Sequence, residues 1–156
     1  MKRLCTVLTI LFLTLTAAGL VSAQSDPFVG TWKLDVAKSK FDPGPAPQSQ
    51  TRTWDASGKV SVEGINAAGK PMSYGYPIMK DGKDYPPMGA IPNKADTIST
   101  KKIDSNTIEA NFMRGGKHAE STKFEVSKDG KMLTINAKGT NPDGSAFNNV
   151  TVWEKQ

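Results

Sequence analysis

Hydrophobic side chains recur at every second position along most of this chain, and that period limits what the chain can fold into. Ile108, Ala110 and Phe112 alternate with Glu109 and Asn111. A period of two is typical of β-strands that bury one face. The same alternation runs through residues 60–62, 74–78, 124–126 and 133–137.

Short segments rich in Gly, Asp and Asn separate these runs and predict tight turns between antiparallel neighbours. About nine or ten strands at a spacing of roughly ten residues indicate an all-β sandwich or barrel. The clearest turn segments are residues 55–59, 80–83, 104–106, 114–117 and 128–131.

Three segments do not follow the alternation. Residues 36–41 read VAKSKF and are the best candidate for a short helix, of one or two turns at most. Residues 41–50 and 84–96 are rich in proline, which removes a backbone donor and favours loops over strands. Long ordered loops of this kind serve either as lids over a functional site or as plain connections.

The first 23 residues have the pattern of a secretory signal peptide. A basic start, Met1 to Arg3, precedes an apolar run from Leu4 to Leu15, and Val21-Ser22-Ala23 offers a small-residue cleavage site. The apolar run is shorter than the ~20 residues that a membrane-spanning helix needs. We therefore expect residues 1–23 to be removed, the protein to be periplasmic or extracellular, and residues 24–156 to form one domain without a membrane span.

The composition of the predicted domain excludes several classes of function. The only cysteine, Cys5, lies in the predicted signal peptide, so the domain has no disulfide or thiolate metal ligand. Removing Lys2 and Arg3 from the 20 basic residues leaves 18 against 15 acidic ones, a net charge of +3. The lysines are scattered among acids rather than clustered, so we expect no nucleic-acid face.

Residues 28–32 read FVGTW, and this Phe-x-Gly-x-Trp motif resembles the opening of the calycins, which include lipocalins and fatty-acid-binding proteins. The longer string of residues 27–47 resembles small secreted bacterial lipocalin-like proteins. The resemblance implies a single antiparallel up-and-down β-barrel of about 8–10 strands around a ligand cavity. Trp32 would close its base, and Gly30 would let the chain cross tightly beneath it.

The sequence also departs from that family. Lipocalins carry an arginine near the last strand that stacks on the tryptophan, but no arginine follows Arg114 here. Lys138 or Lys155 would have to substitute for it. The C-terminal helix of lipocalins and the paired helices of fatty-acid-binding proteins are missing as well, so the resemblance informs the fold more than the ligand.

Few residues are suited to catalysis or to metal binding, and we predict no catalytic residues, no metal site and no cofactor. The only histidine, His118, follows a Gly-Gly turn, where a solvent-facing side chain is expected. No pattern of Ser, His and acid marks a nucleophile with its base. One histidine without cysteine also disfavours structural zinc. We therefore expect a protein that is not an enzyme.

A candidate ligand site comes from the inward-facing aromatic residues and the two arginines of the predicted domain. An arginine inside an apolar barrel is costly unless it meets water or an anion, and a guanidinium matches a carboxylate well. Arg52 or Arg114 would then orient the head of an amphipathic ligand, whose body would contact Trp54, Tyr74, Tyr76 and Phe112. Alternatively, the aromatics fill a dry core and the arginines point outward at strand ends.

The sequence thus predicts a secreted protein that binds a small hydrophobic or amphipathic ligand in a barrel cavity. The alternative is a protein-interaction or inhibitor module with a filled barrel, acting through its proline-rich loops. An enclosed cavity of several hundred Å³ distinguishes the first from the second.

Overall fold

The computed structural model describes residues 26–156, which form ten β-strands. The strands are β1 (Gly30–Lys40), β2 (Ser49–Trp54), β3 (Lys59–Ile65), β4 (Pro71–Pro77), β5 (Asp81–Tyr85), β6 (Thr97–Lys102), β7 (Thr107–Arg114), β8 (Lys117–Val126), β9 (Met132–Thr140) and β10 (Ala146–Lys155). The predicted signal peptide, residues 1–23, lies outside the described residues. Within them, no helix is long and apolar enough to cross a membrane.

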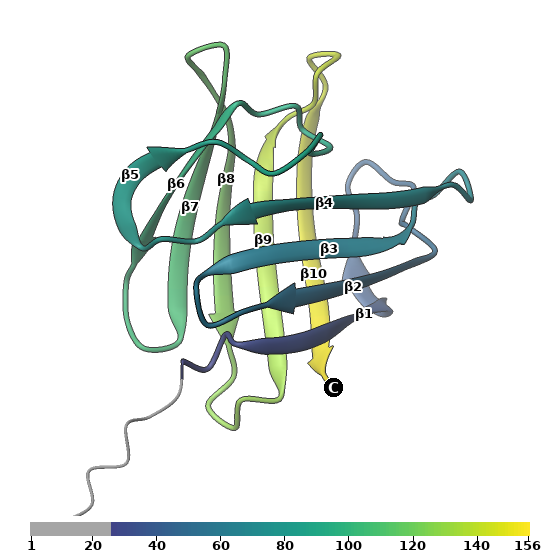
Figure 1. The fold of residues 1–156 in the computed structure, drawn as a ribbon. Coiled ribbons are helices and arrows are strands. Elements are labelled where there is room, and N and C mark those ends of the chain that lie inside the picture. The colour runs from purple at the N-terminus through teal and green to yellow at the C-terminus, as the bar shows by residue number, and fades with distance from the viewer. Residues whose placement is uncertain (1–25) are drawn as a thin grey trace, which may run out of the picture.

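All ladders are antiparallel and join the strands in one continuous sheet of order β4-β3-β2-β1-β10-β9-β8-β7-β6-β5. Figure 1 shows β1–β4 crossing β6–β10 at a steep angle, so the sheet curls into a barrel. The first and last strands of the order, β4 and β5, share no ladder. A single bridge narrows that gap, because Gly75 exchanges two backbone hydrogen bonds of 3.0 and 2.8 Å with Met88.

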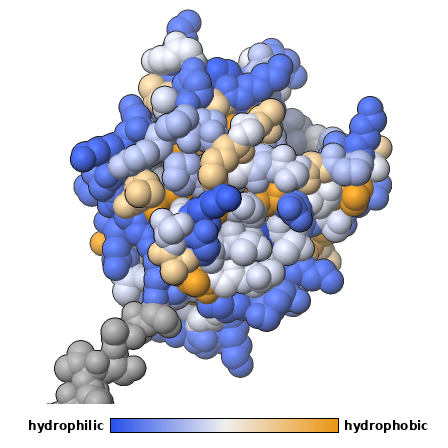
Figure 2. All heavy atoms as spheres, viewed as in Figure 1, coloured by the Kyte–Doolittle hydropathy of each residue, from blue (hydrophilic) through white to orange (hydrophobic). Residues whose placement is uncertain are grey.

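Alternation along the strands builds the core, as the sequence predicts. Ile108, Ala110 and Phe112 on β7 are buried, and the paired strand β8 buries Phe124 against Ile108. The outer positions between them are polar and mostly exposed. Figure 2 shows a largely hydrophilic face on which apolar residues occur singly rather than in one large patch. The apolar interior and polar exterior fix the register of each strand.

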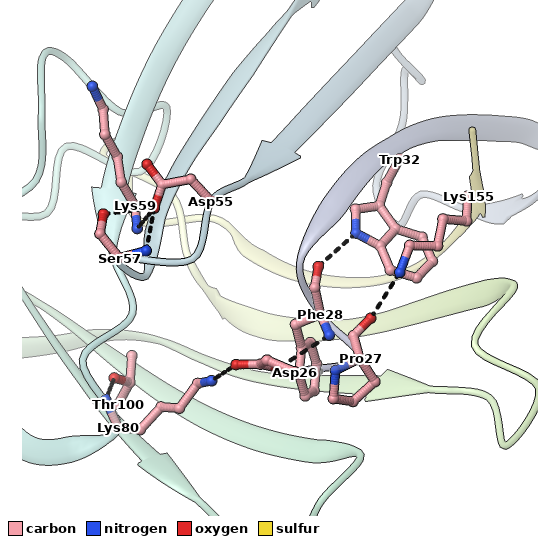
Figure 3. A network of polar contacts seen from close by, with 10 residues as sticks. All are labelled: Asp26, Pro27, Phe28, Trp32, Asp55, Ser57, Lys59, Lys80, Thr100 and Lys155. Atoms are coloured by element: carbon pink, nitrogen blue, oxygen red, sulfur yellow. Dashed lines mark hydrogen bonds and ion pairs between the residues drawn. The ribbon is translucent and has the colours of Figure 1, made fainter. Parts of the chain in front are cut away.

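The base of the barrel is closed by the motif at residues 28–32. Trp32 is fully buried and donates its indole N–H to the carbonyl of Phe28 at 2.9 Å. Lys155 from β10 lies over the indole, with its Nζ 5.0 Å from the ring centroid, and donates to the carbonyl of Pro27 (Figure 3). A Cβ on Gly30 would lie 2.7 Å from Lys155 Cε, so glycine leaves room for this lysine. Of the two lysines considered in the sequence analysis, Lys155 rather than Lys138 lies over Trp32.

The N-terminal segment is tied to the opposite side of the barrel. Asp26 accepts a hydrogen bond from the backbone N–H of Phe28 and pairs with the Lys80 ammonium (Figure 3). The backbone N–H of Lys80 in turn donates to Thr100 Oγ1 on β6 at 2.8 Å. These contacts hold the segment that precedes β1 beneath the barrel.

Two local predictions were wrong. Residues 36–41 are not a helix, because β1 continues to Lys40 and pairs with β10 across a register shift between Asp35 and Lys40. Within that irregularity Ser39 Oγ donates to the Asp35 carbonyl at 2.6 Å, a local turn that imitates the start of a helix. Residues 80–83, predicted as a turn, include the start of a strand, because β5 begins at Asp81. The pairing of β5 with β6 has a register shift between Asp81 and Asp84.

Candidate ligand-binding cavity

A cavity of about 250 Å³ lies inside the barrel, away from the base plug. Its walls come from β2 and β4 on one side and from β7–β10 on the other, and residues from three loops complete it. The aromatic residues of its lining are Phe41, Tyr74, Tyr76, Phe112, Phe124, Phe147 and Trp153. Its polar lining includes Gln50, Arg52, Asn93, Glu120 and Thr122.

Arg52 is the buried cation of this cavity, and only 5% of its surface is exposed. It donates from Nη1 to the hydroxyl of Tyr76. Its guanidinium carbon lies 4.7 Å from the Trp153 ring centroid and 5.9 Å from that of Phe124. Such cation–π contacts partly offset the loss of water around the charge.

The guanidinium of Arg52 is not fully satisfied by the protein. Among residues 26–156, its Nε–H has no hydrogen-bond partner, although the atom is buried. The ion pairs within 4.0 Å in the same part of the chain all involve lysines. Because a buried charged donor without a partner is unfavourable, the site is suited to an anionic or accepting group from a ligand.

Glu120 from β8 is the half-buried acid of the cavity. Its Oε1 accepts from the Thr122 hydroxyl and its Oε2 from the Asn93 amide, both at 2.6 Å. Burial raises the pKa of the Glu120 carboxyl, and those two hydrogen bonds and the charge of Arg52 oppose the rise.

Two tyrosines and a phenylalanine form the aromatic wall beside Arg52. Tyr74 and Tyr76 stack with centroids 6.4 Å apart, and Phe112 meets Tyr76 edge-on at 5.6 Å. Burial raises the pKa of the Tyr74 hydroxyl far above its usual range, so it stays a neutral hydrogen-bonding group. The wall presents apolar surface with two hydroxyls.

The loop between β5 and β6 covers the end of the barrel opposite the base (Figure 1). It places Ile91, Pro92 and Asn93 in the cavity lining. Arg114 holds this loop in place: Nη1 donates to the Asn93 carbonyl at 2.6 Å, and Nη2 donates to the carbonyls of Thr140 and Asn141 at 3.2 Å each. The other proline-rich loop adds Phe41 and Pro43. Both loops therefore contribute to the lining of the cavity.

The structure brings four of the six predicted ligand residues together in one cavity. Arg52, Tyr74, Tyr76 and Phe112 all line it. The remaining two lie elsewhere. Trp54 is buried nearer the base, where its ring packs 4.9 Å from Phe28 and 5.8 Å from Phe124. Arg114 clamps the loops by its three carbonyl contacts and does not line the cavity.

Sequence reasoning missed Glu120 and Trp153 as members of the site. The alternation that predicts Phe124 as inward also places Glu120 inward, four residues earlier on the same strand. Phe112 pairs with Glu120 but Met113 pairs with His118, so a β-bulge lies at Ala119. This bulge precedes Glu120 and leaves the alternation from Glu120 to Phe124 unchanged. Extending the pattern back from Phe124 would have identified the acid.

Groups suited to metal binding or nucleophilic catalysis are sparse. No cluster of three or more His, Cys, Asp or Glu residues suited to a metal occurs in residues 26–156. His118 is exposed and contacts Ser121 Oγ at 2.9 Å, a serine that itself donates to Asn111 on the outer face of the barrel. Neither residue lines the cavity.

The ten-stranded antiparallel meander, with Trp32 buried at its base, is a single up-and-down β-barrel, the fold that the resemblance of the opening motif implies. No family model and no curated protein matches the chain.

Two solved structures show what the chain is similar to in shape. One is a zebrafish ileal bile-acid-binding protein in complex with cholic acid, at 10% identity and a TM-score of 0.49, over 83% of this chain and 99% of the other. The second is As-p18, an extracellular fatty-acid-binding protein, at 14% identity and a TM-score of 0.48, over 84% of this chain and 97% of the other. The assignment of the fold rests on the strand order and the base plug rather than on these similarities.

Proposed function

We propose that this protein binds a small hydrophobic or amphipathic ligand inside its barrel and performs no catalysis. The observation that supports the proposal is the buried guanidinium of Arg52, which lines an aromatic cavity and whose Nε–H has no hydrogen-bond partner among residues 26–156. A ligand carboxylate supplies the missing acceptor, and the aromatic wall contacts the ligand's apolar body.

The volume of the cavity limits the ligand. At about 250 Å³ the cavity lies slightly below the ~300–1,000 Å³ of typical ligand pockets, so the ligand is small. A filled barrel acting through its proline-rich loops is the competing hypothesis. A cavity lined by a buried cation favours the binding function over a filled barrel, because a buried charge is costly unless it meets water or an anion.

Calorimetric titration with octanoate tests the proposal. Wild-type protein is expected to bind saturably, and Arg52→Met is expected to bind at least about tenfold more weakly, because a charge-assisted hydrogen bond is lost. Methionine has a similar volume, and replacing a buried charge by an apolar side chain is often tolerated. The thermal midpoint of the variant confirms folding.

Lys33→Met provides a matched control, because Lys33 is an exposed cation on the neighbouring strand β1. This variant is expected to bind octanoate as the wild type does. Absence of saturable binding to the wild type, or equal binding to Arg52→Met, would contradict the proposed function.

We also propose that the protein is secreted, on the strength of the signal-peptide pattern in residues 1–23. Expression of the full chain in a bacterial host with a Sec pathway is expected to deliver a protein whose intact mass begins at Gln24. Recovery of an uncleaved protein in the cytoplasm would contradict this.

A further inference from the structure

The cavity holds two opposite charges that the protein does not pair with each other. Arg52 and Glu120 both line it, yet no ion pair within 4.0 Å joins them. A buried charge and a half-buried charge that are separated are less favourable than a pair in contact, because each retains much of its desolvation cost. Each charge is partly satisfied by neutral groups only, Arg52 by the Tyr76 hydroxyl and Glu120 by Thr122 and Asn93.

The two groups contact different parts of the cavity lining. Glu120 Oε2 accepts from the amide of Asn93 in the loop between β5 and β6. The Arg52 guanidinium instead donates to the Tyr76 hydroxyl and lies 4.7 Å from the Trp153 ring centroid.

We infer that Arg52 and Glu120 act together as a two-point recognition site for small amphiphiles carrying a carboxylate and, several bonds away, an O–H or N–H donor. The inference rests on the proposed function, since it assumes that Arg52 receives the carboxylate. Glu120 then accepts the donor and selects against a plain fatty acid, whose apolar tail would leave the acid without a new partner.

The raised pKa of Glu120 agrees with this assignment. The titratable or charged groups that influence its carboxyl are Arg52, His118 and Tyr74. An ammonium or hydroxyl donor from a ligand adds to the hydrogen bonds from Thr122 and Asn93 that stabilise the ionised carboxylate.

Calorimetry with three chain-matched ligands tests the inference: octanoate, 8-hydroxyoctanoate and 8-aminooctanoate. Wild-type protein is expected to bind both substituted acids about tenfold more tightly than octanoate, because one added hydrogen bond to a charged group changes the affinity by about that factor. Glu120→Gln is expected to remove most of the preference for 8-aminooctanoate. Glu120→Asp, which withdraws the carboxylate by one methylene, is a second variant with the same expected direction.

Glu125→Gln is the matched control, because Glu125 lies on the same strand but on the outer face, paired with Lys123 at 2.8 Å. It is expected to leave every preference unchanged. If binding depends on Arg52 but the order of the three ligands is the same in wild type and both Glu120 variants, the two-point site is wrong while the proposed function stands. If none of the three ligands binds, both are wrong.

Discussion

At the scale of single residues, the cationic side chain at the base of the barrel and the one in its interior lie in different environments. Lys155 keeps its ammonium at the surface while its stem covers Trp32. Arg52 carries its charge into the cavity among aromatic rings. Lys155 therefore stabilises the folded barrel. Burial of the Arg52 charge costs folding free energy, and a role in ligand binding explains why this residue lies in the cavity.

The contact of Lys155 with Trp32 gives a prediction about stability. Lys155→Met is expected to lower the free energy of unfolding by about 0.5–1 kcal/mol, the usual contribution of an exposed cation–π pair. Urea denaturation followed by tryptophan fluorescence measures this change. Lys138→Met, which alters the other lysine considered for this role, is expected to change stability by less than about 0.5 kcal/mol. Equal effects of the two substitutions would contradict the assignment of Lys155.

Glu120 gives a prediction about pH. Burial raises its pKa above the ordinary value of 4.5, so the folded state holds the proton more tightly than the unfolded state does. Its contribution to stability is therefore greatest below pH 4.5 and falls as the pH rises through the folded-state pKa. Glu120→Gln removes this loss, so its stability relative to wild type is expected to increase from pH 4 to pH 8 in urea denaturation. Parallel curves for the two proteins would contradict the burial of the acid.

At the scale of elements, close approach of strands fixes the position of Glu120. A Cβ on Gly139 of β9 would lie 2.1 Å from the carbonyl oxygen of Ala119 and 2.8 Å from the Cα of Glu120. The backbone of β8 therefore passes Gly139 at a distance that only glycine permits. This contact fixes how closely the backbone of β8 approaches β9 at Glu120.

Gly139→Ala is accordingly expected to destabilise the protein by about 1–3 kcal/mol, because the two strands must separate. Gly44→Ala is the matched control, since the nearest atom to a Cβ there is 3.9 Å away. Chemical denaturation compares the two variants. Equal stability of both would show that β8 and β9 accommodate the methyl group without strain.

The loop between β5 and β6 gives a prediction about local motion. Arg114→Met removes three hydrogen bonds to the carbonyls of Asn93, Thr140 and Asn141. Amide hydrogen exchange in residues 89–95 and 140–145 is expected to accelerate, while the base strands keep their protection. Lys117→Met, an exposed position across the same hairpin, is the control. Unchanged exchange in both loops would contradict the clamp.

At the scale of the whole molecule, the sequence predicts the barrel well and the site in part. Strand parity places Arg52, Tyr74, Tyr76 and Phe112 inward, because alternation along each strand is a local property. Strand parity does not predict that Trp54 lies outside the cavity, because the depth of a residue along the barrel depends on how distant strands cross. The contact of Arg114 with three carbonyls is non-local in the same way, and no local pattern predicts it.

The central claim is that Arg52 receives a ligand carboxylate inside this barrel. The most direct measurement is a ¹H–¹⁵N NMR titration that follows the Arg52 Nε–H resonance, assigned with Arg52→Met, as octanoate is added. A saturable downfield shift of this resonance is expected, because its buried N–H gains an anionic acceptor. A resonance that stays in place while octanoate binds elsewhere, or no binding at all, would show that Arg52 does not receive the carboxylate.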